Sequence, residues 1–142
     1  SNVDTVDADG DVTLKQNTMT DLITAGGDVT LKSDTDAGDI TSGGDVTVKQ
    51  NAEISTVDAD GDVEIKSGSS SGSVTSDGNV KAKSDVQIAG DINTTGGSGG
   101  VTLNDGVVVD GDVFVPNEDS LTCKGTVSIN GQSCSEYKND NY

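Results

Sequence analysis

Apolar residues recur along this chain in short alternating pairs, and a glycine–aspartate step precedes each pair. The step stands at Gly10-Asp11 and returns every 17 residues as far as Gly61-Asp62, and Gly78-Asn79 follows as a related member. The first apolar position after each step is always valine, at Val12, Val29, Val46, Val63 and Val80. A fixed period of this length is typical of a repeat architecture in which each unit is one structural element.

Each repeat predicts three short strands. Apolar and polar residues alternate with a period of two, as in strands that bury one face, and Gly, Asp, Asn or Ser separate the alternating stretches. One unit cannot bury its own apolar face, whereas stacked units form a continuous core. We therefore expect an all-β fold, a single parallel β-helix (β-solenoid) of roughly triangular section. It would have about 17 residues per coil and rise about 4.8 Å per coil.

Two finer features of the coil follow from the same pattern. Parallel crossovers favour a right-handed coil, while left-handed coils built from hexapeptides have a similar length and remain the alternative. The glycine of each Gly-Asp step is expected to supply a positive φ at a corner, since glycine adopts that conformation without steric cost.

The regular period covers residues 3–92 and then changes. Residues 93–100 (NTTGGSGG) interrupt it, and less regular coils continue to residue 134, so the predicted solenoid spans 1–134. Residues 135–142 are polar and predict a frayed tail. The only cysteines, Cys123 and Cys134, fall in the irregular part, and a disulfide between them would fix the last coil as a cap, stabilising the fold by about 2–3 kcal/mol. Two buried thiols are the alternative.

Composition excludes several classes of function. The chain has 8 Lys plus Arg against 25 Asp plus Glu, a net charge of −17, no His and three aromatic residues. Nucleic-acid binding requires a basic surface, and no apolar run is long enough for membrane insertion. Without His, a nucleophile motif or a nucleotide-binding motif, we expect neither an enzyme nor an organic cofactor. A disulfide would indicate an oxidising compartment, which means secretion to the cell surface or the exterior.

Stacking converts each repeated outward residue into a ladder along the rod. The Lys ladder consists of Lys15, Lys32, Lys49, Lys66 and Lys83. The Asp ladder consists of Asp11, Asp28, Asp45 and Asp62, which Asn79 continues. Like charges one coil apart repel, and we expect Asp34 and Asp85 to offset the lysines. The ladders are either a solvated face or surfaces for lateral bundling, the Lys ladder of one rod against the Asp-rich face of another.

Alternating carboxylates beside a glycine are candidate calcium ligands, because hard cations prefer oxygen clusters. They occur in two copies, Asp7, Asp9 and Asp11, and Asp58, Asp60 and Asp62. Neither copy has the distal bidentate Glu of an EF-hand loop, and ordinary corners that carry Asp are the alternative. Calcium is the only ion that the sequence suggests.

The two ends of a solenoid expose unpaired strand edges unless something covers them. We therefore expect head-to-tail self-association into a homopolymer, because a heterologous contact of this kind propagates into a filament. The predicted assembly residues are Val3, Val6, Val12 and Leu14 at one end, and Val113, Val115, Val127 and Ile129 at the other. A fragment of a longer solenoid, or an edge blunted by charge, is the alternative.

Two families share this repeat pattern over residues 3 to about 115. Thr24–Ser33 (TAGGDVTLKS) and Thr41–Gln50 (TSGGDVTVKQ) resemble repeats of filamentous-haemagglutinin-type adhesins, exported right-handed β-helices of bacterial surfaces. The 17-residue coil with its GDI steps, Gly38–Ile40 and Gly90–Ile92, is also similar to bactofilins, which polymerise end to end without nucleotide. The resemblance implies a structural role and carries over no functional residue.

The sequence thus predicts a structural subunit of an extracellular filament or surface appendage, serving adhesion or a biofilm matrix. A monomeric adhesin stalk or binding module of a surface protein is the main alternative. A cytosolic bactofilin-like scaffold and an ice-binding solenoid are further alternatives, although Glu64 and Lys81 interrupt the outward threonine column that ice binding would need.

Overall fold

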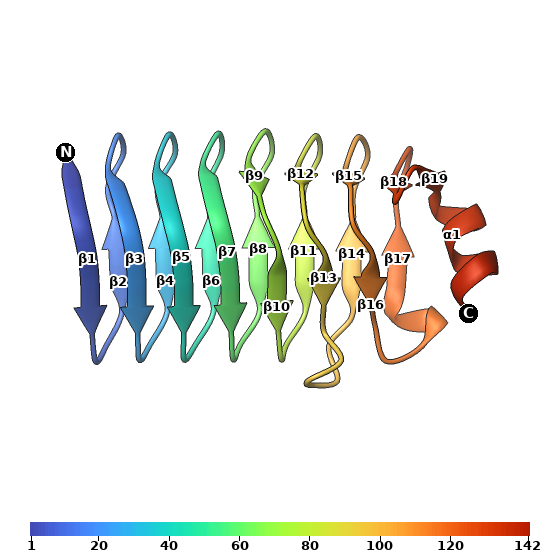
Figure 1. Ribbon diagram of the computed structural model, residues 1–142, viewed down its shortest axis with the longest axis horizontal. Helices are drawn as coiled ribbons and strands as arrows, with labels where there is room; N and C mark the ends of the chain where they lie inside the picture. The colour runs from blue at the N-terminus through green and yellow to red at the C-terminus, as the bar shows by residue number, and fades with distance from the viewer.

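Strands one coil apart pair in parallel along the whole rod, and they pile up into a solenoid of about eight turns (Figure 1). The computed structural model describes residues 1–142. In Figure 1 the nearer strands point down, the more distant strands point up, and the chain advances from left to right. The coil is therefore right-handed, as the crossover preference predicts.

Two sheets make up the walls of the rod. The larger sheet contains β1 (Asn2–Ala8), β3 (Met19–Ala25), β5 (Asp36–Ser42), β7 (Glu53–Ala59), β9 (Ser70–Ser71), β10 (Val74–Ser76), β12 (Gln87–Ile88), β13 (Ile92–Asn93), β15 (Val108–Val109), β16 (Val113–Phe114), β18 (Ser128–Ile129) and β19 (Gln132–Ser133). The smaller sheet contains β2 (Val12–Leu14), β4 (Val29–Leu31), β6 (Val46–Val48), β8 (Val63–Ile65), β11 (Val80–Ala82), β14 (Val101–Leu103) and β17 (Leu121–Cys123).

The period predicted from the sequence equals the number of residues between paired positions in neighbouring strands. Val29 of β4 pairs with Val12 on one side and Val46 on the other, so neighbours in the sheet lie 17 residues apart. On its other side Val80 pairs with Val101, 21 residues on, because residues 94–100 form an irregular loop that lengthens this coil. The pairing resumes after the loop, which confirms that the interruption adds residues to one coil without ending the solenoid.

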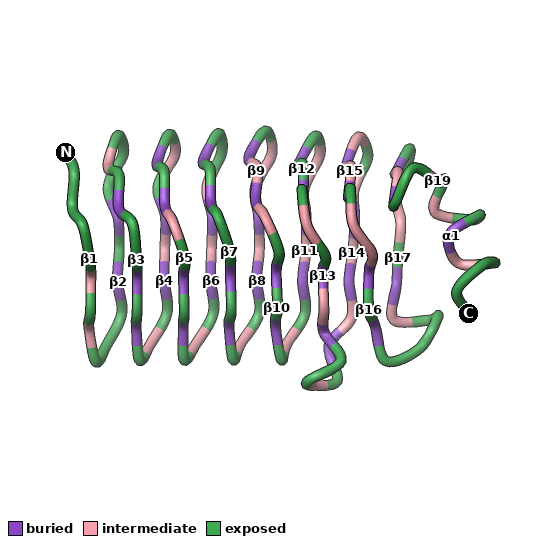
Figure 2. The backbone as a smooth tube through the Cα atoms, in the orientation of Figure 1, coloured by how far each residue is buried: buried purple, intermediate pink, exposed green.

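Stacked aliphatic side chains fill the interior. Figure 2 shows the buried positions recurring from one coil to the next, in rows along the rod. The largest side chains with almost no exposed surface are Ile23, Leu31, Ile40, Ile65, Ile88, Ile92, Leu103, Leu121 and Ile129. A narrow interior of this kind needs no aromatic volume, since each aliphatic side chain packs on its equivalents one coil away.

The three predicted strands of each unit are partly fused. In the first four coils, two of the three predicted strands are joined into one strand of seven residues, as in β5. From the fifth coil onward these two strands are separate, as in β9 and β10. Within β5 the buried residues Ala37 and Ile40 are three positions apart, and Gly38 and Asp39 between them face outward. This change of spacing turns the wall by a corner while the pairing with the next coil continues.

The predicted role of the Gly-Asp glycines is wrong. None of them has a positive φ; that conformation recurs instead at the corner after the Lys ladder, at Asn17, Asp34, Asn51, Gly68 and Asp85. Asn and Asp are the non-glycine residues that tolerate this region best, because their short polar side chains form local hydrogen bonds. Asp34 and Asp85 are therefore corner residues.

The glycines of the Gly-Asp step are required for space. A Cβ atom on Gly44 would collide with Oδ1 of Asp28, the ladder residue one coil earlier. That same oxygen accepts a hydrogen bond from the backbone N–H of Asp45, 2.8 Å away. Each glycine thus leaves room for the preceding aspartate to reach the next coil, and a carboxylate acceptor makes this a charge-assisted bond.

The Asp ladder is consequently a column of hydrogen bonds between coils. Its members satisfy backbone N–H groups that belong to no strand, which would otherwise depend on water. The N–H donors along the column are those of Asp28, Asp45, Asp62 and Asn79, each 2.7 to 2.8 Å from the acceptor of the previous coil. Asn79 continues the column with a neutral acceptor, since its Oδ1 accepts from the N–H of Gly100 at 2.9 Å.

Residues 135–142 are not a frayed tail, contrary to the prediction. Cys134–Asn141 form helix α1, and the short 3-10 helix η1 (Glu118–Ser120) precedes β17. The prediction of a frayed tail rested on the polarity of this segment. The segment is polar because Tyr137 is the only residue that α1 buries.

We predict that Asp45→Ala lowers the free energy of unfolding by about 1–2 kcal/mol, because the N–H of Asp62 loses its acceptor. Asp45→Asn should retain most of the stability, since Asn79 shows that an amide oxygen suffices. Urea unfolding followed by circular dichroism measures both. Asp58→Ala, which removes an equal charge from an exposed side chain that forms no hydrogen bond, is the control; equal effects at the two positions would contradict the account.

Candidate functional site

The Lys ladder is unpaired over its first three coils. Lys15, Lys32 and Lys49 line a polar hollow at the corner that follows β2, β4 and β6, and none of them forms an ion pair. Neither Asp34 nor Asp85 forms an ion pair with a ladder lysine, so the expected compensation by these residues is wrong. The ammonium groups of these three coils remain free for an external partner.

The last two lysines of the ladder have neighbours within the chain. Lys66 forms an ion pair with Glu64 at 2.5 Å. The hydrogen bond from Lys66 lowers the pKa of the Glu64 carboxyl below its ordinary value, although partial burial opposes this. The hydrogen bond with Lys81, followed by the charge of Lys81, lowers the pKa of Lys83. The ladder therefore changes character where Glu64 and Lys81 replace the outward threonines.

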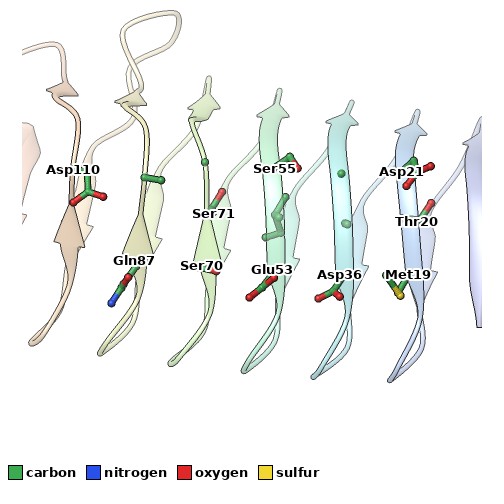
Figure 3. A pocket seen from close by; sticks show the side chains of 15 residues that line it. Met19, Thr20, Asp21, Asp36, Glu53, Ser55, Ser70, Ser71, Gln87 and Asp110 are labelled. Atoms are coloured by element: carbon green, nitrogen blue, oxygen red, sulfur yellow. The ribbon is translucent and has the colours of Figure 1, made fainter.

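A groove follows the rod axis across the larger sheet, with a volume of about 710 Å³ (Figure 3). It lies at the bend where two successive residues of each long strand face outward. One rim consists of Met19, Asp36, Glu53, Ser70 and Gln87. The other consists of Asp21, Gly38, Ser55, Gly72, Ala89 and Asp110. The buried residues Thr20, Ala37, Ile54 and Ser71 lie between the rims.

Sequence reasoning missed this groove, although a signal was present. The second rim repeats small residues at a spacing of 17, from Gly38 through Ser55 to Gly72. A column of small outward residues on a sheet leaves a hollow between larger neighbours. The groove contains no lysine, and its four carboxylates, those of Asp21, Asp36, Glu53 and Asp110, make it acidic.

The calcium candidates do not assemble into a site. Asp11 and Asp62 belong to the Asp ladder and bond to the next coil. Asp7 and Asp58 are exposed residues of β1 and β7, and the remaining two candidates lie in the turns that follow these strands, at Asp9 and Asp60. The structure brings no three acidic residues close enough together to hold a metal ion.

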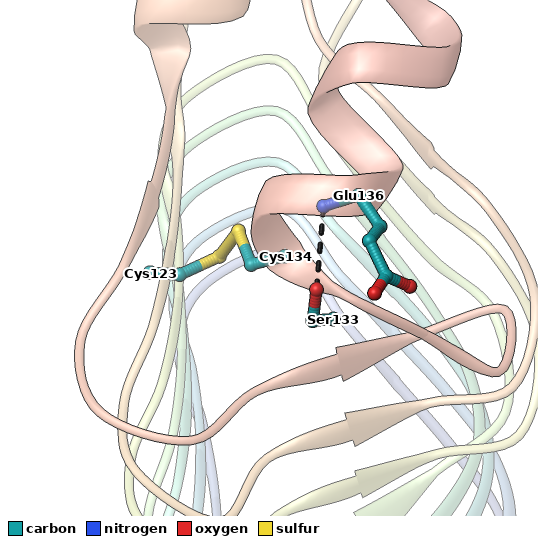
Figure 4. Close-up of a disulfide and its surroundings, with 4 residues drawn as sticks. All are labelled: Cys123, Ser133, Cys134 and Glu136. Carbon is teal, nitrogen blue, oxygen red and sulfur yellow. Dashed lines mark hydrogen bonds between the residues drawn. A yellow bond between two sulfur atoms is a disulfide. The ribbon is translucent and has the colours of Figure 1, made fainter.

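A cap covers part of the C-terminal end of the rod, while the outer edges of β16 and β17 have no further strand beside them. β19 pairs antiparallel with β18, and α1 follows it directly. The predicted disulfide between Cys123 and Cys134 is present and joins β17 to the first residue of α1 (Figure 4). The hydroxyl of Ser133 caps the helix by accepting a hydrogen bond from the N–H of Glu136 at 3.3 Å. A covalent bond and a strand thus hold this cap in place.

Tyr137 is the residue of α1 that contacts the core. Its side chain is 2% exposed, and its hydroxyl oxygen accepts a hydrogen bond from the N–H of Val113 at 2.9 Å. Burial raises the pKa of the Tyr137 hydroxyl, and the charge of Asp112 adds to this, while the hydrogen bond with the Val113 backbone opposes it. One signal for this role was present in the sequence, because the two tyrosines, Tyr137 and Tyr142, are the only residues with a large apolar body in the segment 135–142.

The two ends of the rod therefore differ. The outer edges of β1 and β2 have no strand beside them, and Val3 is 38% exposed. Val6 is partly buried, and Val12 and Leu14 are slightly more exposed than their equivalents one coil further on. The opposite set of predicted assembly residues is already buried within the chain: Val113, Val115, Val127 and Ile129. Since β19 and α1 lie over part of this end, the head-to-tail contact expected there stays a prediction.

Comparison with protein-family models, curated proteins and solved structures found no match to this chain. The stacked parallel coils expected from the adhesin and bactofilin resemblance are present, whereas membership of either family stays a prediction. The structure contains no helix with the length and apolar character needed to cross a membrane.

We predict that raising the pH through the Tyr137 titration undocks α1. The folded state disfavours the phenolate, so the tyrosine adds stability below its unfolded pKa of about 10, and this stability is lost as the pH rises through the higher folded pKa. Ultraviolet absorption of tyrosinate and near-ultraviolet circular dichroism at pH 9 to 12 would measure the transition. Tyr142→Phe leaves Tyr137 as the only tyrosine; if it then ionises at the pH of a free tyrosine with no loss of structure, the prediction fails.

Proposed function

We propose that this chain is a structural rod of an extracellular surface appendage, extended by stacking of a further coil on its N-terminal edge. The role is mechanical, in adhesion or a biofilm matrix, and involves no catalysis. The β-solenoid architecture, which is typical of structural repeat proteins, supports this role.

The difference between the two ends is the observation that carries the proposal. The edges of β1 and β2 present unpaired backbone N–H and C=O groups, which form a template for further strands. The apolar side chains of Val3 and Val6 lie beside these edges and are only partly covered. An added coil would bury them and complete both sheets. At the other end, β19 pairs with β18 and the disulfide-fastened α1 obstructs further stacking, although the edges of β16 and β17 carry no further strand.

This arrangement revises the head-to-tail polymer expected from the sequence. Head-to-tail growth needs two open ends, and the cap obstructs one of them. The proposal therefore places coil stacking at the edges of β1 and β2, where a second copy of this 142-residue chain, or further coils of a longer solenoid, would supply the strands. Two copies joined in this way would form one continuous rod with a disulfide-fastened cap at each end.

The extracellular setting rests on the disulfide and the charge. Disulfides persist in oxidising compartments and are rare in the cytosol, and this bond fastens the cap. A net charge of −17 keeps a rod with long sheets dispersed in solvent. The acidic groove favours a second candidate function, a binding module on a stalk, because it offers a long concave surface along the side of the rod.

We predict that Val3→Lys prevents end-to-end pairing of the 142-residue chain. The ammonium group would be buried between two joined coils without a partner, which opposes association. Leu22→Lys is the matched control, because Leu22 on β3 is 39% exposed and lies one coil inside the edge. Sedimentation velocity and negative-stain electron microscopy should show double-length rods for the wild type and for Leu22→Lys, and single rods for Val3→Lys. Single rods for the wild type at every concentration would overturn the proposal.

A further inference from the structure

Three carboxylates of the groove lie on three successive coils and lack partners. Asp21, Asp36 and Glu53 belong to β3, β5 and β7, which are neighbours in the larger sheet. None of their carboxylates accepts a hydrogen bond or forms an ion pair within the chain. Side chains from the successive strands line the groove in Figure 3. The groove thus presents a short row of unneutralised negative charge.

Buried hydroxyl groups beneath the groove also lack partners. Thr20 and Ser71 line it and are each 4% exposed. The side-chain oxygens of both residues have no hydrogen-bond partner. Both residues alternate with the outward rim residues, so their hydroxyl groups lie beneath the floor of the groove. The carboxylates on its rims are therefore what suits the groove to a cationic occupant.

The same chain carries a cationic row of matching length. Lys15, Lys32 and Lys49 are the unpaired part of the Lys ladder, and they also lie on three successive coils. The coil repeat sets the axial spacing of both rows, about 4.8 Å. Two rods lying side by side can therefore match the lysines to the carboxylates in axial spacing, whichever way the rods point, with Asp21 on one rim of the groove and Asp36 and Glu53 on the other.

We propose that the Lys15, Lys32 and Lys49 row of one copy docks into the Asp21, Asp36 and Glu53 groove of a second copy, as a lateral contact between rods. This contact replaces the bundling through the Asp ladder that the sequence suggested. The ladder carboxylates already accept hydrogen bonds from the next coil, so the groove is the acidic surface that remains free. The lateral contact is independent of the end-to-end contact proposed above.

Overall charge sets the conditions for this contact. Each copy carries −17, so distant charges on two rods repel. At physiological ionic strength the screening length is about 8 Å, which suppresses that long-range repulsion and leaves adjacent ion pairs largely intact. Lateral association should therefore be strongest at intermediate salt and weaken both at very low and at very high salt.

A charge exchange tests the contact. One variant reverses the lysine row (K15E, K32E and K49E), and a second reverses the groove (D21K, D36K and E53K). Each variant alone should associate about 100-fold more weakly than the wild type, because three ion pairs become three like-charge contacts. An equimolar mixture should restore association, since the unchanged groove of the first variant then meets the unchanged lysine row of the second, and the glutamate row of the first meets the lysine groove of the second.

The readouts separate this contact from end stacking and from nonspecific charge effects. Sedimentation equilibrium gives the association constant, electron microscopy distinguishes rods paired side by side from double-length rods, and circular dichroism checks that each variant is folded. A control variant with D7K, D58K and D60K carries the same charge change outside the groove and should, by itself, associate about as strongly as the wild type.

Three results would overturn the proposal. They are a wild-type protein that shows no side-by-side pairing at intermediate salt, a mixture that restores nothing, and a control variant that by itself loses as much association as the groove variant does. Binding of an oligolysine peptide to the groove without any self-association would also overturn it, because the groove would then belong to a cationic chain from another molecule.

Discussion

Hydrogen bonding between successive coils is the interaction on which the rest of this structure depends. No coil can form a core by itself, and each strand finds its partners one coil before and one coil after. The aliphatic interior follows from this arrangement, because residues such as Ile23 and Ile40 meet only when their strands are in register. The same register aligns the equivalent outward residues of successive coils in a row along the rod. The chemistry of the surface is therefore set by these rows and not by single residues.

Like charges stacked one coil apart repel each other, and the Asp ladder and the Lys ladder differ in how this repulsion is offset. The aspartates turn toward the next coil and accept its backbone N–H groups, so that a potentially repulsive row becomes part of the scaffold. The first three ladder lysines have no such internal partner. This asymmetry leaves one cationic row and one acidic groove on the same rod, and it is the physical basis for lateral contact between copies.

The 17-residue period predicted most of the fold. The five valines that follow the glycine steps indicated the register of the strands, and the structure confirms the solenoid and its coil length. It also contains the predicted disulfide. Features that depend on contacts between coils escaped prediction. Gly44 is needed for the side chain of Asp28 one coil away, which a single unit cannot reveal. The groove arises from a bend in the wall, and helix α1 forms because Tyr137 finds a buried site that its polar neighbours in sequence do not indicate.

Amide hydrogen exchange of the Asp ladder tests the central claim most directly. The backbone N–H groups of Asp28, Asp45 and Asp62 lie outside the strands. Their only hydrogen-bond acceptor is the aspartate carboxylate of the preceding coil. The account predicts that they exchange about as slowly as strand amides such as that of Val29, measured by nuclear magnetic resonance. Exchange as fast as that of the exposed loop residue Ser98 would contradict the account.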